Sequence, residues 1–259
     1  MSGYILCQTK KAQRPYFIEN ISMNIYSIEE LCYYLYHNLY LADHTVFNEE
    51  LCNWLRDELE LVHLAAKLKQ NLERNVSVEE MIYPVFKEIN YLAYEELRTL
   101  NGRIERRNSE SEEIREKQKG DALMENRMYV NAIRVYQKLL EKESKDVSGE
   151  MRERIFHNQG CAYSYLFQMD KALDCFFMAW RENRSEKALK VYLLAYRSVH
   201  SQEEFEKRLE ELKVEETVKE EVAGRLEKFL SLPEQKIASG ETDRILENLT
   251  REYHRSTGS

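Results

Sequence analysis

Cysteine and histidine are the side chains of this sequence best suited to nucleophilic, general-base or metal-binding chemistry. Such chemistry needs these groups at fixed spacings, so that they converge in one pocket. Cys32 and His37 lie five residues apart, which puts them on different faces of a helix, and Cys52 and His63 fall in different predicted helices. The sequence has no HExxH, GxSxG, CxxC or glycine-rich phosphate-binding motif. We therefore expect no catalytic residues, no metal and no cofactor.

The net charge and the cysteine content indicate which kinds of partner the protein can bind and in which cellular compartment it resides. The net charge is −8, and lysine and arginine are nowhere concentrated enough to indicate a nucleic-acid-binding surface. Five cysteines, an odd number without paired spacing, argue against a disulfide framework and for a reducing compartment. No apolar run reaches the roughly 20 residues that a membrane span requires. We expect a soluble, cytoplasmic protein with no nucleic-acid and no membrane partner.

Helices must position any functional surface, because the sequence has few residues that interrupt helices. Only 8 glycines and 3 prolines occur in 259 residues. Ser27 with Glu30, and Ser77 with Glu80, form the capping-box pattern that begins a helix. The one strand signal is at 4–19, where YILC and PYFIEN flank a polar stretch and predict a small β-hairpin. The predicted fold class is all-α, with this hairpin near the N-terminus.

Two glycines inside predicted helices begin segments of matching spacing. A glycine within a helix costs about 1 kcal/mol relative to alanine, so the missing side chain must serve a purpose. We expect each segment to be an antiparallel helical hairpin, in which the glycine faces an alanine of the second helix and aromatic residues flank the crossing. The matching residues at offsets of 3, 9, 12 and 16 are Leu123, Tyr129, Ala132 and Tyr136 after Gly120, and Tyr163, Met169, Ala172 and Phe176 after Gly160.

This pattern resembles the tetratricopeptide repeat, a family in which small residues face each other across each helical hairpin. Ala179 adds a further match, in the second helix of the second hairpin. Gly160 follows Gly120 by 40 residues, whereas this repeat has a period of about 34. The extra residues fall in KESKDVSGE, which we expect to be a longer loop. The family's proline after the second helix is absent from both segments.

The resemblance extends over about residues 112–212 and includes a weaker third hairpin, in which Ala195 stands where the others have glycine. It implies antiparallel hairpins stacked as a short solenoid. The predicted domains are a mostly helical N-terminal module at 1–100, which resembles no family, the repeats at 101–212, and capping helices with a frayed tail at 213–259.

The resemblance also implies a function, since stacked hairpins of this family bind peptides or partner proteins on a concave face lined by first helices. We therefore expect a non-catalytic interaction scaffold or adaptor. Tyr165 is the best aromatic anchor, because tyrosine is enriched at binding hot spots, although packing against the next repeat is an equal alternative. The residues expected on the concave face are Lys117, Asp121, Glu125, Arg154, His157, Asn158, Cys161 and Tyr165.

A narrower possibility is binding of acidic chaperone tails. Some members of the family hold such tails through a carboxylate clamp of lysine, asparagine and arginine side chains. Lys117 and Asn158 match positions of the clamp, but Asp121 puts a carboxylate where the clamp has an asparagine. In the third hairpin Lys187 or Lys190 is available, but no arginine follows at the matching position.

A regulatory role and self-association stay open as well. Helical repeats also occur as peptide-responsive regulators that switch an attached domain, and the N-terminal module at 1–100 could carry an enzymatic activity of its own. A homo-oligomer is possible, because solenoid ends and tyrosine-rich helix faces can pair. The sequence names no partner.

Overall fold

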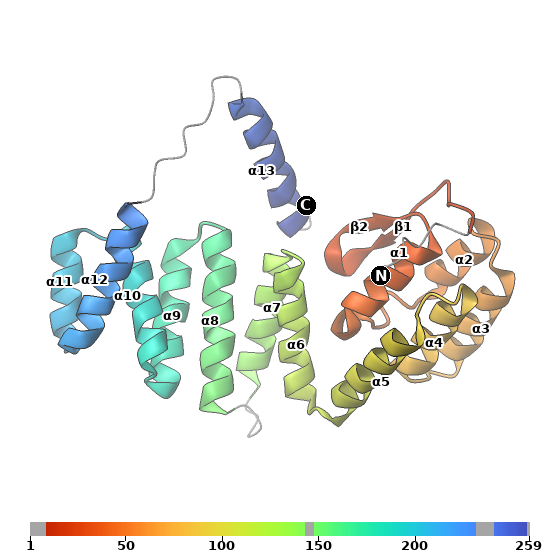
Figure 1. Cartoon of the computed structure of the whole chain (residues 1–259), viewed down its shortest axis with the longest axis horizontal. Helices are drawn as coiled ribbons and strands as arrows, with labels where there is room; N and C mark the ends of the chain where they lie inside the picture. The colour runs from red at the N-terminus through yellow and green to blue at the C-terminus, as the bar shows by residue number, and fades with distance from the viewer. Residues whose placement is uncertain (1–8, 143–147, 232–240, 258–259) are drawn as a thin grey trace. The chain divides into compact units, whose positions relative to one another are not determined.

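We describe the protein from a computed structural model, which covers residues 9–142, 148–231 and 241–257. The chain divides into two compact units, Met1–Arg127 and Met128–Ser259, and each is described by itself. Apart from one two-stranded hairpin, the regular elements of the described residues are helices, which confirms the predicted fold class. Figure 1 labels the elements in chain order.

The first unit holds the hairpin and the helices of the N-terminal module. Its helices pack as neighbours in the chain, α2 on α3 and α3 on α4, while α1 also contacts α4. The elements are β1 (Tyr16–Ile18), η1 (Glu19–Ile21), β2 (Met23–Ile25), α1 (Ile28–His37), η2 (Leu39–Leu41), α2 (Glu49–Asp57), α3 (Val62–Glu73), α4 (Val78–Glu88), α5 (Tyr94–Ser109) and α6 (Glu112–Glu125).

Helices α1 and α4 begin where the serine pattern predicted. The Ser27 hydroxyl oxygen accepts a hydrogen bond from the Glu30 amide at 3.2 Å, and the Ser77 oxygen accepts one from the Glu80 amide at 3.4 Å. Each serine thereby satisfies an amide that the first turn of a helix cannot pair internally.

The hairpin forms, but with a different second strand from the predicted one. β1 pairs antiparallel with β2, which follows it in the chain, with Tyr16 opposite Ile25. Residues 4–7, the other expected strand, lie outside the described residues. The pairing puts Ile18 and Ile25 in the core, and the Tyr16 hydroxyl donates to the Val46 carbonyl at 2.9 Å. The described residues thus form a hairpin over 16–25, and the predicted pairing with residues 4–7 is not tested.

Helix α6 belongs to the first unit, which differs from the expected boundaries at 100 and 212. Lys119 Nζ contacts Asp43 Oδ2 at 2.8 Å, and Asn126 Nδ2 donates to Asn38 Oδ1 at 2.6 Å. These contacts join residues far apart in the sequence, so they give no sequence signal. The division falls at Arg127, between the two helices of the first predicted hairpin.

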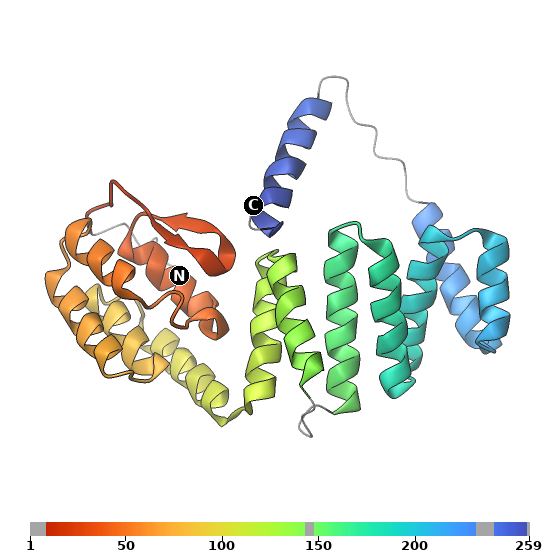
Figure 2. The same ribbon diagram turned by 180° about the vertical axis from the view of Figure 1, so that it is seen from behind.

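The second unit is a row of helices in which consecutive members pack side by side. α7 packs on α8, α8 on α9 and α9 on α10, while α10 contacts both α11 and α12. Figure 2 shows α8, α9 and α10 as neighbours from the opposite side. The elements are α7 (Tyr129–Glu141), α8 (Gly149–Tyr165), α9 (Met169–Asn183), α10 (Glu186–Val199), α11 (Gln202–Glu211), α12 (Glu216–Leu230) and α13 (Thr242–Thr257).

Gly160 explains how closely α8 and α9 approach. A Cβ atom built on Gly160 would lie 2.6 Å from Phe176 Cε1, which is closer than real Cβ contacts allow. The three nearest atoms all belong to the Phe176 ring, so the ring, rather than Ala172 as expected, occupies the space that the missing side chain leaves. Tyr129 and Met169 are half-buried; the other predicted packing residues are buried, namely Gly120, Leu123, Ala132, Tyr136, Gly160, Tyr163, Ala172, Phe176 and Ala179.

Arg208 of α11 joins three helices of this unit. Its guanidinium lies 5.1 Å from the ring centre of Phe177 and 5.6 Å from that of Tyr192, and Nε donates to the Tyr192 hydroxyl at 2.9 Å. A planar cation over aromatic rings, with its own hydrogen bond, is a stable way to bury part of an arginine. This contact holds α11 against α9 and α10.

The last helices differ in how they pack. α12 buries Val218 and Val222, in keeping with its predicted role as a capping helix. α13 continues as helix to Thr257 and so includes the first residues of the tail that was expected to fray from His254. Within the described ranges, no helix combines the length and the apolar content that crossing a bilayer requires.

Candidate functional site

The expected concave-face residues are divided between the two units. Lys117, Asp121 and Glu125 lie on α6 of the first unit, whereas the others lie on α8 of the second. Glu125 is exposed, and Arg154 forms an exposed ion pair with Glu150 at 2.6 Å, a contact of little energetic weight. The eight residues therefore come from two compact units, whereas the repeat pattern implied one stack of hairpins.

The residues that matched the carboxylate clamp already have partners inside the protein. Lys117 pairs with Asp121 one turn along α6. Asn158 donates a hydrogen bond from Nδ2 to the Tyr136 hydroxyl at 3.4 Å, which links α8 to α7. A negative charge beside the lysine opposes a second carboxylate. This arrangement does not favour binding of an acidic tail.

His157 and Cys161 lie one turn apart on α8, with Nε2 and Sγ separated by 3.7 Å. Burial, and then the positive charge of Lys187, lower the pKa of His157, while burial raises the pKa of Cys161. Both shifts favour the neutral forms. A nucleophilic cysteine needs the opposite, a thiolate stabilised by a charged imidazole. His157 packs with Phe176, whose ring centre lies 5.8 Å from that of the imidazole.

The remaining described cysteines are also placed as apolar side chains. Cys32, Cys52 and Cys175 are buried free thiols, and burial raises the pKa of each, to about 12 for Cys175. Within the parts of the chain that the structure describes, histidine, cysteine and carboxylate groups do not gather in threes that could hold a metal ion.

Tyr165 lies in an exposed aromatic group at the end of α8. Its ring stacks on Tyr129 at a centroid distance of 4.6 Å and an angle of 4°, and it is 62% exposed. Phe167, in the turn that follows, is 88% exposed. We call Tyr129, Tyr165 and Phe167 the aromatic tip. It presents large apolar rings to solvent on a rigid base.

The backbone at Phe167 makes its exposure more informative. Its φ is 56°, a left-handed conformation that a bulky residue rarely adopts. The turn ends α8 with the hydrogen bonds of a Schellman motif, from the Phe167 amide to the Ser164 carbonyl and from the Gln168 amide to the Tyr163 carbonyl. Glycine is the usual residue there. Phe167 thus has neither a packing nor a backbone reason to be phenylalanine.

Sequence reasoning selected Tyr165 but missed Phe167. A signal existed, because Phe167 follows Gly160 as Arg127 follows Gly120, and Arg127 also has a positive φ, of 61°. Both residues stand where a helix-ending turn favours glycine. A phenylalanine at such a position of a predicted repeat is unusual enough to mark a surface.

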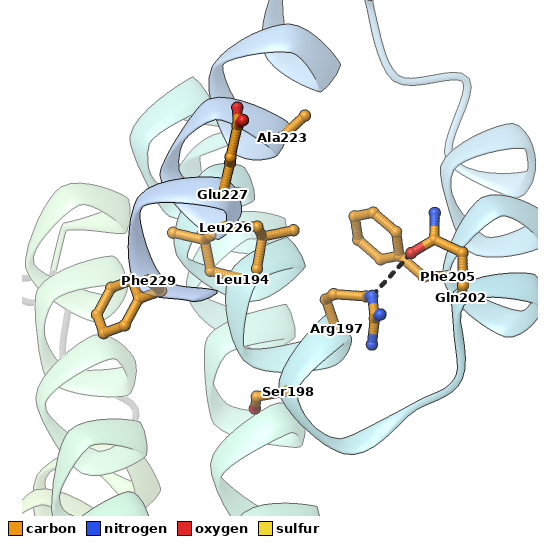
Figure 3. Close-up of a pocket in the computed structure, with 9 residues that line it drawn as sticks. All are labelled: Leu194, Arg197, Ser198, Gln202, Phe205, Ala223, Leu226, Glu227 and Phe229. Carbon is orange, nitrogen blue, oxygen red and sulfur yellow. Dashed lines mark hydrogen bonds between the residues drawn. The ribbon is translucent and has the colours of Figure 1, made fainter. Parts of the chain in front are cut away.

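A pocket lies at the other end of the second unit, among α10, α11 and α12 (Figure 3). Its volume is about 710 Å³ and its lining is mostly apolar. Arg197 is held at the rim, since Nε donates to Gln202 Oε1 at 2.9 Å and Nη1 to the His200 carbonyl at 3.0 Å. We call this the C-terminal pocket; the lining side chains used below are Leu194, Arg197, Phe205, Ala223, Leu226 and Phe229.

The C-terminal pocket suits apolar side chains rather than a reaction. Leu194, Phe205 and Leu226 come from three different helices and line its interior, whereas Phe229 is 71% exposed. The sequence did not reveal this pocket, because it depends on how those helices meet. Compared with known proteins, the chain matches no family model, no curated protein and no solved structure, so its geometry alone carries the functional argument.

Proposed function

We propose that this protein is a non-catalytic interaction scaffold that binds a partner protein through the aromatic tip of its second unit. The observation that carries the proposal is Phe167, whose ring is 88% exposed on a left-handed backbone. Exposing a ring of this size forgoes about 1.5–3 kcal/mol of burial. The left-handed conformation costs a non-glycine residue roughly 1–2 kcal/mol more. A gain on binding a partner accounts for the exposed ring, whereas the left-handed conformation is one that the chain also has at other helix-ending turns, such as Arg127 and Lys213.

The geometry around Phe167 supports the same function. Tyr165 is held by its stack on Tyr129, so an incoming surface meets a ring that loses little freedom on binding. Rigid, exposed aromatic side chains are the usual anchors of protein interfaces. At the same turn, the Lys171 ammonium lies 5.5 Å from the ring centre of Tyr163, which adds a cation at the edge of the surface.

Affinity capture with matched variants tests the proposal. The tagged protein, Tyr165→Ser, Phe167→Ser and the control Tyr94→Ser are used as bait, and the captured protein is purified and titrated against each. Tyr94 is 78% exposed in the first unit, so its variant removes a similar ring from another surface. We expect the two tip variants to bind about tenfold or more weakly, as hot-spot truncations do, and Tyr94→Ser to bind like the original protein.

Equal binding by all four proteins would move the partner site away from the aromatic tip. Capture of no protein by any bait would contradict the scaffold function itself. Thermal unfolding followed by circular dichroism separates lost binding from lost folding, since both tip residues are exposed and their variants should unfold cooperatively.

A further inference from the structure

The C-terminal helix presents an apolar stripe that remains exposed. In α13, Ile245, Leu246 and Leu249 lie on one face at helical spacing, and Tyr253 continues that face by one turn. Leu246 and Leu249 are each 55% exposed. A short helix in water gains most of its stability from packing such a face. The stripe therefore calls for a surface to cover it.

The C-terminal pocket is a surface of matching chemistry. Leu194, Leu226 and Phe205 provide an apolar interior, and Phe229 stands beside it with most of its ring in water. Figure 3 shows Leu194 and Leu226 among the side chains that line this pocket. A lining of this kind suits apolar side chains better than a polar small molecule, which needs several convergent polar groups. An amphipathic helix that lays two or three large side chains into such a hollow is a common mode of recognition.

The stripe and the pocket of one chain lie at opposite ends of the second unit. α13 contacts α7, the first helix of the row, whereas the pocket is formed by α10, α11 and α12, which follow α8 and α9. The contact with α7 leaves Leu246 and Leu249 exposed. In this structure α13 therefore does not occupy the C-terminal pocket of its own chain.

We infer that the occupant is α13 of a second copy, and that two copies form a dimer in which each stripe fills the other copy's C-terminal pocket. An antiparallel arrangement of two rows brings each stripe beside the opposite pocket and makes the interface two-fold symmetric. A helix of 16 residues is about 24 Å long and buries a modest area when seated alone. Two such contacts approach the roughly 1,600 Å² of a standard protein–protein interface.

Two single variants, each disabling one half of the contact, test this inference on the full chain. Leu249→Glu puts a charge in the stripe, and Phe229→Glu puts one at the pocket, and both residues are exposed enough for the fold to tolerate the change. Arg251→Gln is the matched control, because it alters the net charge by the same amount on the opposite face of α13. Molar mass is measured by light scattering after gel filtration, through the micromolar range of concentrations.

We expect the unaltered protein and Arg251→Gln to reach twice the chain mass of 31.0 kDa. Each glutamate variant should dissociate at least about tenfold more readily, because it damages both contacts of the dimer. Mixing the two variants should restore dimers, since Leu249→Glu retains an intact pocket and Phe229→Glu retains an intact stripe. That pair keeps one complete contact, so its mass should fall between those of the variants and of the original protein.

Three results would overturn the inference. A protein that stays monomeric at every concentration has no such contact. Variants that remain dimeric associate through another surface. A mixture that stays monomeric shows that the two surfaces do not meet between copies. Tyr165 is not among the residues proposed for this contact, so Tyr165→Ser should still dimerise, and the dimer and the scaffold function can fail separately.

Discussion

The α8–α9 hairpin and the α10–α12 end of the second unit are built from similar helices but differ in how completely they close. In the hairpin, Gly160 admits the Phe176 ring and the two helices pack tightly. At the other end, Ala195, which the repeat pattern aligns with the glycine positions, is only half-buried, and a pocket of about 710 Å³ borders Leu194. The comparison shows that the hairpin with a glycine at its crossing is tightly closed, whereas the end without such a glycine leaves an apolar pocket.

The largest effect should come from closing the space at Gly160. Gly160→Ala improves helix propensity by about 1 kcal/mol, but the new Cβ would meet the buried Phe176 ring at 2.6 Å. Overpacking of this kind costs typically about 1–3 kcal/mol. We expect a net loss of up to about 2 kcal/mol in the free energy of unfolding, measured by urea denaturation.

A second substitution identifies the cause of that loss. Phe176→Leu shortens the side chain that Gly160 accommodates, so Gly160→Ala should cost less in its presence than alone. Equal costs in both backgrounds would mean that the crossing depends on something other than the ring, and would remove the physical basis of the comparison.

A glycine at the open end should respond to substitution in the opposite direction. Gly224 lies within α12, and a Cβ built on it meets no atom within 4 Å. Gly224→Ala should therefore gain the helix propensity without a clash and raise the unfolding free energy by about 0.5–1 kcal/mol. The same urea series gives the value, and a destabilised Gly224→Ala would show that the open end leaves no room for a methyl group.

A smaller gain in stability should accompany a loss of binding at the aromatic tip. Phe167→Gly relieves the left-handed backbone at φ 56°, at the expense of a more flexible unfolded chain. We expect the unfolding free energy to rise by a few tenths to about 1 kcal/mol, while partner binding weakens. A variant that loses stability instead would mean that the ring is needed for the fold, and the functional role of Phe167 would lose its main support.

The smallest effect concerns pH and the closed hairpin. Burial and Lys187 lower the pKa of His157 from its ordinary value of 6.5, so the unfolded chain takes up this proton before the folded one. Protonation of His157 therefore does not lower the free energy of unfolding above pH 6.5, and it lowers that free energy as the pH falls below 6.5. We expect His157→Gln to lose less stability than the original protein between about pH 7.5 and 5.5, as measured by thermal unfolding. Parallel curves for the two proteins would show that His157 is not desolvated in the folded state.

Sequence patterns predicted those features of the fold that depend on residues close together in the chain. The serine caps at Ser27 and Ser77 begin helices because their oxygens satisfy amides three residues away. Gly160 indicated a close crossing of two helices, because a glycine within a helix is unfavourable unless the missing side chain allows closer packing. Tyr165 was selected as an anchor and is exposed at the end of its helix.

The sequence did not predict those features that depend on side-chain packing between different helices or on the exposure of a residue in the folded protein. The fine geometry of the crossing brings Phe176, rather than Ala172, against Gly160, because ring orientation depends on the packing of both helices. The positive φ of Phe167 becomes informative only when the turn and its exposure are seen together.

The sequence by itself determined that this protein is helical, where two of its first helices begin, and that one hairpin closes around a glycine. Each of these depends on residues within a few turns of one another, so periodicity and capping chemistry suffice. The tertiary structure alone decided that α6 joins the first unit through Asp43 and Asn38, that β1 pairs with β2, and that three helices leave the C-terminal pocket. Those outcomes follow from contacts between segments far apart in the chain, whose geometry no local pattern encodes.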